Sequence, residues 1–282
     1  MTEKENKKEG LRFFGEFSDE KIPLAETALH LALENHRGRS LGPYLTHIKK
    51  ICDQVGQRFE DLIAAGASDN PETKIASLKH VICDQHGYAG DEETYNDLRN
   101  ANMIEVIDRR KGLPIALSIL AIEAGKAQGW EVFGINFPGH FLLRFDQEGK
   151  RVICDPFHQF RILQASDLRQ LLKSVVGQDA ELSATLYQEA SNREILLRLQ
   201  NNIKFRQIEK EEYEEALGTV AMMRSFAPDE HRLLLDESVL NARLGNIASA
   251  IDLVRQYLHS VTDPGDRYDA ELLLRTLETS LE

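Results

Sequence analysis

The sequence predicts an α+β domain followed by an all-helical array, and three observations support this fold class. Stretches with helical spacing of apolar residues fill roughly the first hundred residues. An apolar helix and alternating strands follow between 109 and 155. Beyond 190 the pattern returns to helices and repeats. Helices that precede a sheet in this way are typical of α+β proteins.

The N-terminal part of the first domain is expected to be helical. Breakers such as Gly42-Pro43 separate its apolar stripes. The expected helices cover 22–33, 44–65, 72–85 and 102–110. A charged stretch at 1–15 precedes them, and we expect it to be a disordered tail. The first domain is placed at 16–190.

The centre of the chain predicts a buried helix over Pro114–Ala127, because nearly all of its residues are apolar or small. Pro114 suits the first helical turn, where its missing N–H group would have no partner in any case. Gly129 ends the helix. Trp130–Phe137 then carries β-branched and aromatic residues, which favour a strand.

A hairpin with a defined register is expected next. Phe141, Leu143 and Phe145 alternate with His140, Leu142 and Arg144, which is strand periodicity, and Asp146–Gly149 has turn chemistry. A four-residue turn would pair Phe145 with Lys150 and therefore His140 with Asp155. Cross-strand neighbours lie within reach of a hydrogen bond. A carboxylate that orients an imidazole is the supporting half of a catalytic triad.

Four ordered segments carry a family resemblance: Asp97–Asn100, Val106–Ile115, Pro138–Phe141 and Asp155–Phe157. Together they resemble the SirB-type family of bacterial proteins, over roughly 20–280 of this chain. The resemblance implies a transglutaminase-like, papain-related domain followed by tetratricopeptide-like repeats. It fixes the fold more than the function, because one fold hosts many activities.

The resemblance also identifies a missing nucleophile. In this fold a cysteine opens the buried helix, where the helix N-terminus and the histidine lower its pKa. Pro114 occupies that position here. Cys154 is expected to point to the apolar face of its strand. Cys83 ends a helix before a glycine loop, and nothing in the sequence places this cysteine near the active-site cleft of the fold. Ser118 lies among apolar neighbours, so packing is the favoured interpretation of it.

Other polar residues are candidates for a pocket rim, namely Asn136, Arg110 and Glu105. The basic run Arg109-Arg110-Lys111 is either a solvated cluster or a site that gathers an acidic ligand at a helix N-terminus. The histidines at 80, 86 and 158 have no metal-site spacing and are interpreted as surface or hydrogen-bonded residues. No metal and no cofactor are expected.

The C-terminal segment, 191–282, contains an internal repeat. Ala216 and Ala250 are 34 residues apart (250 − 216), and both lie where two helices would touch. Leu244-Gly245-Asn246 marks a tight turn between paired helices. A period of 34 with small residues at the contacts is typical of tetratricopeptide repeats.

Composition limits the class of partner. The chain has 34 Lys and Arg against 46 Asp and Glu, a net charge of −12. This balance argues against binding to nucleic-acid backbones and to anionic membranes. The three cysteines form no disulfide framework, and no run is apolar enough to span a membrane. We expect a cytoplasmic protein.

Two functions follow from these observations. The first is a non-catalytic binding or regulatory protein, whose protein or peptide partner docks on the C-terminal repeats. The second is a hydrolase or acyl-transferase in which His140 and Asp155 activate water, or act with a displaced cysteine.

Overall fold

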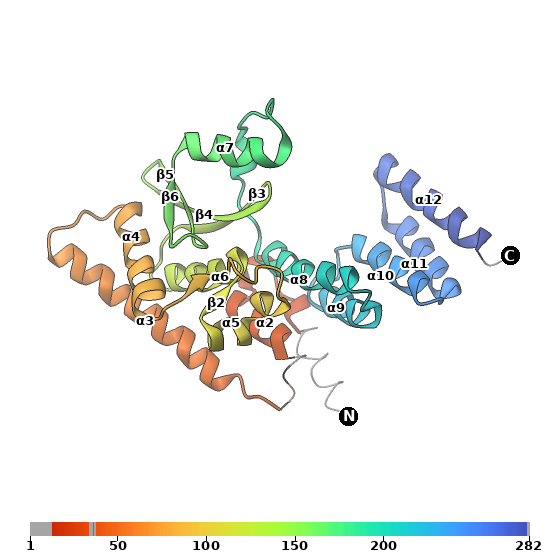
Figure 1. Ribbon diagram of the computed structural model, residues 1–282, viewed down its shortest axis with the longest axis horizontal. Coiled ribbons are helices and arrows are strands. Elements are labelled where there is room, and N and C mark those ends of the chain that lie inside the picture. Colours follow the sequence, from red (N-terminus) through yellow and green to blue (C-terminus); the bar gives the residue numbers. More distant parts are fainter. Residues whose placement is uncertain (1–12, 34–35, 37, 281–282) are drawn as a thin grey trace. The chain divides into compact units, whose positions relative to one another are not determined.

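The computed structural model describes residues 13–33, 36 and 38–280, and the chain divides into two compact units (Figure 1). The larger unit spans 19–199, and the smaller one joins 13–18 to 200–280. The division falls inside helix α8 (Asn192–Glu209), whereas the sequence predicts a boundary near 190, just before this helix. Most of the predicted tail, 1–12, lies outside the described residues, but 13–15 are helical and Phe14 is buried.

The larger unit contains six described α-helices that lie wholly within it, and the first five lie close to their predicted positions. They are α2 (Leu24–Ala32), α3 (Gly42–Ala64), α4 (Pro71–Leu78), α5 (Met103–Arg109), α6 (Pro114–Lys126) and α7 (Ala165–Val176). A π-helical segment, Lys79–Gln85, continues α4, and short 3-10 segments occupy Asp19–Lys21, Leu98–Ala101 and Ala184–Tyr187. The Asp19 carboxylate caps α8 by accepting hydrogen bonds from the backbone of Asn192 and Arg193, both at 2.8 Å.

A four-stranded antiparallel sheet forms most of the β-part of the larger unit. Its strands follow chain order: β3 (Val132–Phe137), β4 (His140–Gln147), β5 (Lys150–Asp155) and β6 (Arg161–Leu163). Figure 1 shows α7 on one side of this sheet and α6 on the other. On the α7 side, apolar residues of all four strands pack against Leu168 and Leu172 of the helix; the strand residues are Ile135, Phe137, Leu142, Ile153 and Leu163. The residues that alternate with them in β4 and β5 face the side of α6.

Helix α6 is buried along most of its length, as its composition predicts. Gly125 lets the helix approach the sheet closely, because a Cβ atom there would lie 2.7 Å from the side chain of Val132. Leu113 is the N-cap residue and Pro114 the first helical residue.

A two-residue parallel ladder, absent from the sequence prediction, lies just before α6. Strand β1 (Ala89–Gly90) pairs with β2 (Lys111–Gly112). A Cβ atom on Gly90 would lie 2.5 Å from the ring of Phe157, so the loop after β5 packs directly on β1. The ladder therefore brings three separate segments to the start of the central helix.

The predicted hairpin register is wrong by two residues. The turn consists of Glu148 and Gly149 alone, with φ of 50° and 80°, and it pairs Gln147 with Lys150. Two residues with positive φ form the type I′ turn that suits the twist of a hairpin. A shift of two preserves the faces of the strands. However, the last pair is Leu143 with Cys154, so Asp155 is not the cross-strand neighbour of His140.

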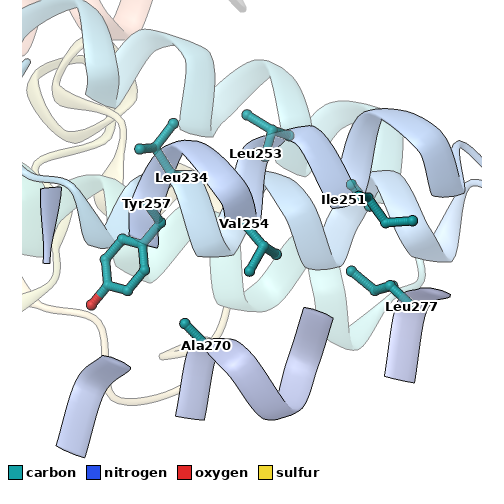
Figure 2. Packing of buried hydrophobic residues seen from close by; sticks show 8 residues of the cluster. Leu234, Ile251, Leu253, Val254, Tyr257, Ala270 and Leu277 are labelled. Carbon is teal, nitrogen blue, oxygen red and sulfur yellow. The ribbon is translucent and has the colours of Figure 1, made fainter. Parts of the chain in front are cut away.

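The smaller unit continues from α8 with α9 (Tyr213–Phe226), α10 (Arg232–Arg243), α11 (Ile247–Ser260) and α12 (Pro264–Thr279). Each of these helices packs on the next along the chain. Figure 2 shows the cluster that joins the last three: Leu234, Ile251, Leu253, Val254, Tyr257, Ala270 and Leu277. Helices α9 and α11 begin 34 residues apart (247 − 213), and Ala216 and Ala250 are fully buried. The tetratricopeptide assignment stays a prediction.

Among the described residues, no helix combines the length and the apolar character needed to cross a membrane.

Candidate functional site

His140 and Asp155 lie on the α7 side of the sheet, at the ends of β4 and β5. Both line a cavity of about 300 Å³ between the sheet and α7. The lining residues are His140, Asp155, His158, Arg161, Leu163, Asp167, Gln170, Leu171 and Ser174. The two predicted residues therefore share a cavity, although they are not a cross-strand pair.

The Asp155 carboxylate is held by its own loop. One oxygen accepts a hydrogen bond from the backbone N–H of Phe157 at 2.9 Å, and the other lies 2.7 Å from Nδ1 of His158. Among the described residues, the imidazole of His140 has no hydrogen-bond partner. Burial lowers the pKa of His140, and the negative charge of Asp155 opposes this shift. His140 is therefore biased toward its neutral form.

His158 takes the role that the sequence assigned to His140. An aspartate that binds Nδ1 orients the imidazole, and Nε2 of His158 lies 3.8 Å from the Glu92 carboxylate, beyond hydrogen-bond distance. The hydrogen bond between Asp155 and His158 joins residues three apart in the chain, and an Asx-type turn from Asp155 to Phe157 accompanies it. The sequence Asp-Pro-Phe-His could have signalled this turn. From the sequence, His158 is interpreted only as a surface or hydrogen-bonded residue, and its bond to Asp155 is not predicted.

The nucleophile position is on the other side of the sheet from this cavity. Pro114 begins α6, which packs against the opposite face of β3 and β4. The Ser118 hydroxyl donates to the Pro114 carbonyl at 2.8 Å and is fully buried, so it serves the helix and not a reaction.

Comparison with known proteins identifies the domain. Residues 43–201 match the family described as the Transglutaminase-like superfamily, which is 159 of 282 residues (201 − 43 + 1). The chain belongs to the transglutaminase-like superfamily. No solved structure matches it at a significant level. The finer resemblance to SirB-type proteins stays a prediction.

Similar proteins occur in bacteria and in animals. A UPF0162 protein of Xylella fastidiosa is 27% identical over 243 residues, which cover 85% of this chain and 84% of that protein. A UPF0162 protein of Vibrio cholerae is 32% identical over 204 residues, with 72% and 74% covered. F-box only protein 21 of Homo sapiens is 27% identical over 178 residues, which cover 61% of this chain but 28% of that protein.

The cysteines of this transglutaminase-like chain are not activated. Burial raises the pKa of Cys52 and of Cys83 to about 11. Cys154 pairs with Leu143 on the α6 side of the sheet, and complete burial raises its pKa well above the usual range. Reactive cysteines need a lowered pKa and a nearby cation or helix N-terminus. None of the three meets the first condition.

The predicted rim residues are not brought together. Asn136 accepts a hydrogen bond from Arg198 at 2.9 Å, and Arg198 also donates to the backbone oxygen of His140. The Glu105 carboxylate lies 3.3 Å from Nε2 of His36. Arg110 lines a second cavity, which neither of the other two residues lines.

The structure separates the three cations of the basic run. Arg109 is largely buried and binds the carboxylate of Asp91 at 2.9 Å. Burial alone would raise the pKa of Asp91, but hydrogen bonds, including the one from Arg109, lower it to about 2. Lys111 lies 3.6 Å from Glu93. Arg110 instead contacts residues from distant parts of the domain.

Arg110 sits in a polar cluster that sequence reasoning did not find. Its Nη1 group donates to Nε2 of His47 at 2.7 Å and to the hydroxyl of Tyr88. Its guanidinium also lies 4.8 Å from the centre of the Tyr88 ring. Burial, helped by the charge of Arg110, lowers the pKa of His47 to about 4. Burial raises the pKa of Tyr88 to about 12, so both partners are neutral at pH 7.

Within the part of the chain that the structure describes, no three His, Cys, Asp or Glu side chains are placed to hold a metal ion.

Proposed function

We propose that this protein acts by binding a protein or peptide partner and not by covalent catalysis. The observation that carries the proposal is Pro114 as the first residue of α6, where the superfamily resemblance places a cysteine. Proline has no side-chain nucleophile, so the covalent route through a thioester is closed at this position.

The state of the natural thiols supports the same proposal. Cys154 faces the side of α6, away from the cavity of His140 and His158. The pKa values of Cys52 and Cys83 are raised and not lowered. A thiolate is the attacking species in cysteine enzymes, and burial of this kind opposes its formation.

The helices of the smaller unit offer a surface for a partner. On α12, Tyr268 and Leu272 are 68% and 55% exposed, and their positions are four apart, so they lie on one face of the helix. An amphipathic peptide or an apolar side chain would bury such a pair. In F-box only protein 21 the similar segment is 28% of a longer chain, which agrees with a domain used as one module among others.

The experiment is capture of a partner by the full-length chain from a bacterial extract. We expect the double variant Tyr268→Ser/Leu272→Ser to capture about one tenth of the amount of partner that the wild type captures, or less. The matched control is Val175→Ser/Val176→Ser at the end of α7, where the two valines are 52% and 61% exposed. Equal losses in both variants, or unchanged capture by the α12 variant, would contradict docking on the smaller unit.

A second candidate, a hydrolase that activates water, rests on the bond between Asp155 and His158. In this pair Nε2 of His158 makes no hydrogen bond to the described residues, lies 3.8 Å from the Glu92 carboxylate, and can accept a proton from water at the cavity. If the chain hydrolyses an activated ester, His158→Ala should abolish the excess rate and His140→Ala should not. If the wild type hydrolyses the ester no faster than the His158→Ala variant does, the hydrolase function is excluded.

A further inference from the structure

The second cavity of the larger unit has no role in the proposed function. Its volume is about 490 Å³, within the range of sites for small molecules. It lies between the start of α3 and the end of α5. The lining residues are Arg39, Ser40, Pro43, Tyr44, His47, Ile107, Asp108 and Arg110.

The charges at this cavity do not balance. Arg39 binds the carboxylate of Asp108 at 2.6 Å, and the Tyr44 hydroxyl lies 3.2 Å from the same carboxylate. Arg110 has no carboxylate at ion-pair distance among the described residues; its hydrogen-bond partners are the imidazole of His47 and the phenol of Tyr88. The described lining therefore carries one uncompensated positive charge.

Arg110 is held in place before any ligand arrives. It ends α5 in the left-handed conformation, with φ of 60° and ψ of 22°, which is unfavourable for a residue with a Cβ atom. The β1–β2 ladder fixes its backbone, since the Arg110 carbonyl accepts from Ala89 at 3.0 Å. The Tyr88 ring and hydroxyl fix the guanidinium. Strained residues that the surrounding structure holds in this way cluster at functional sites.

The donors that remain suit an oxyanion. A guanidinium carries five N–H donors in a planar fork. Only Nη1 of Arg110 is used by the described residues, which leaves Nε and Nη2 without partners among them. Nε and Nη2 lie side by side on the fork and can bind two oxygens of one carboxylate or phosphate group.

We propose that Arg110 anchors a binding site for a small ligand that carries a carboxylate or phosphate group. The cavity beside Arg110 accepts the body of the ligand, with Ile107 and Pro43 as apolar wall and the Tyr44 hydroxyl as a polar contact. His47 stays neutral and accepts from Arg110, so it does not repel the guanidinium that binds the anion. This cavity shares no lining residue with the cavity of Asp155.

Nuclear magnetic resonance of the arginine side chains of the full chain tests the proposal at neutral pH. Sodium phosphate and sodium acetate are added in separate titrations, with sodium chloride holding the ionic strength constant. We expect the Nε–H signal of Arg110, identified by its loss in Arg110→Gln, to shift and saturate with at least one anion. Saturation by phosphate alone indicates a phosphate-bearing ligand, and by acetate alone a carboxylate ligand.

Three variants make the result specific. Arg110→Gln should lose the saturable shifts of neighbouring signals, and Arg99→Gln, an exposed arginine paired with Asp97, should keep them. Asp108→Asn removes the one carboxylate among the described lining residues and should tighten binding about fivefold or more. The Asp108 variant remains informative even if Arg110→Gln does not fold. No saturable shift with either anion, equal shifts in Arg110→Gln, or unchanged affinity in Asp108→Asn would overturn the proposal.

Discussion

At the residue scale, Asp155 has two histidines in its cavity and binds one of them. The hydrogen bond to Nδ1 of His158 is 2.7 Å long, whereas His140 interacts with Asp155 only through charge. A double-mutant cycle should therefore give a coupling free energy of about 1 kcal/mol for Asp155 with His158. The coupling of Asp155 with His140 should be smaller by at least half. Urea unfolding of Asp155→Asn and the two His→Ala variants measures both, and equal couplings would contradict this geometry.

His47 makes stability depend on pH. Its pKa falls from 6.5 to about 4 on folding, so the unfolded state binds more protons between these values. The free energy of unfolding should decrease as pH falls from about 6.5 toward 4, and the part due to His47 is on the order of 1 kcal/mol because solvent screens this half-buried group.

The measurement for His47 is urea unfolding at pH 7.5 and pH 5 (about one unit above the lowered pKa) in wild type and His47→Gln. The variant should lose less stability between the two values. The pKa of His30, His86 and His140 is also lowered by burial, so some decrease remains in the variant. An identical decrease in both chains would show that His47 is not held neutral.

At the scale of elements, two turns of the helical array have the same backbone geometry with different residues. Gly245 follows α10 with φ of 80°, and Glu211 stands 34 residues earlier with φ of 60°. The bonds from Glu212 N to Gln207 O and from Asn246 N to Asn241 O also correspond. Glu211→Gly should raise the free energy of unfolding by about 0.5–1 kcal/mol, and Gly245→Ala should lower it by about 1 kcal/mol. Thermal unfolding of the full chain checks both signs.

The start of α6 yields another prediction. Pro114→Cys would place a half-buried thiol at the N-terminus of a 13-residue helix, which lowers a thiol pKa. We expect this cysteine to react with iodoacetamide faster than the three natural ones. The rate should not change in the His140→Ala background, because His140 lines the cavity on the opposite side of the sheet. A slower reaction in that background would contradict the placement of His140.

The elements differ in how far their sequences specify them. The predicted and observed ends of helix α6 nearly coincide. Its continuous apolar run is stable only when it is buried, so the sequence specifies it well. The hairpin has the predicted strands and faces but a different turn, since Glu148 gives no signal that it adopts positive φ. The ladder of β1 and β2 has two residues per strand, too few for any periodicity to appear.

At the scale of the whole molecule, the sequence predicts an α+β region followed by helices, and the structure has both. It does not predict the cluster of Arg110, because His47 is 63 residues away and Tyr88 is 22 residues away in the chain. Only the β1–β2 ladder and the packing of α3 bring these three together. The predicted pairing of His140 with Asp155 is wrong, but both residues remain on one face of the sheet, because a register shift of two preserves the strand faces.

None of the three thiols of this transglutaminase-like chain is activated. Reaction of the native full chain with iodoacetamide at neutral pH, followed for each cysteine by peptide mass spectrometry, tests this claim most directly. We expect Cys52, Cys83 and Cys154 to react more slowly than in the urea-unfolded chain, and His140→Ala and His158→Ala to leave all three rates unchanged. A cysteine that reacts faster in the native chain, and slows when either histidine is replaced, would contradict the claim.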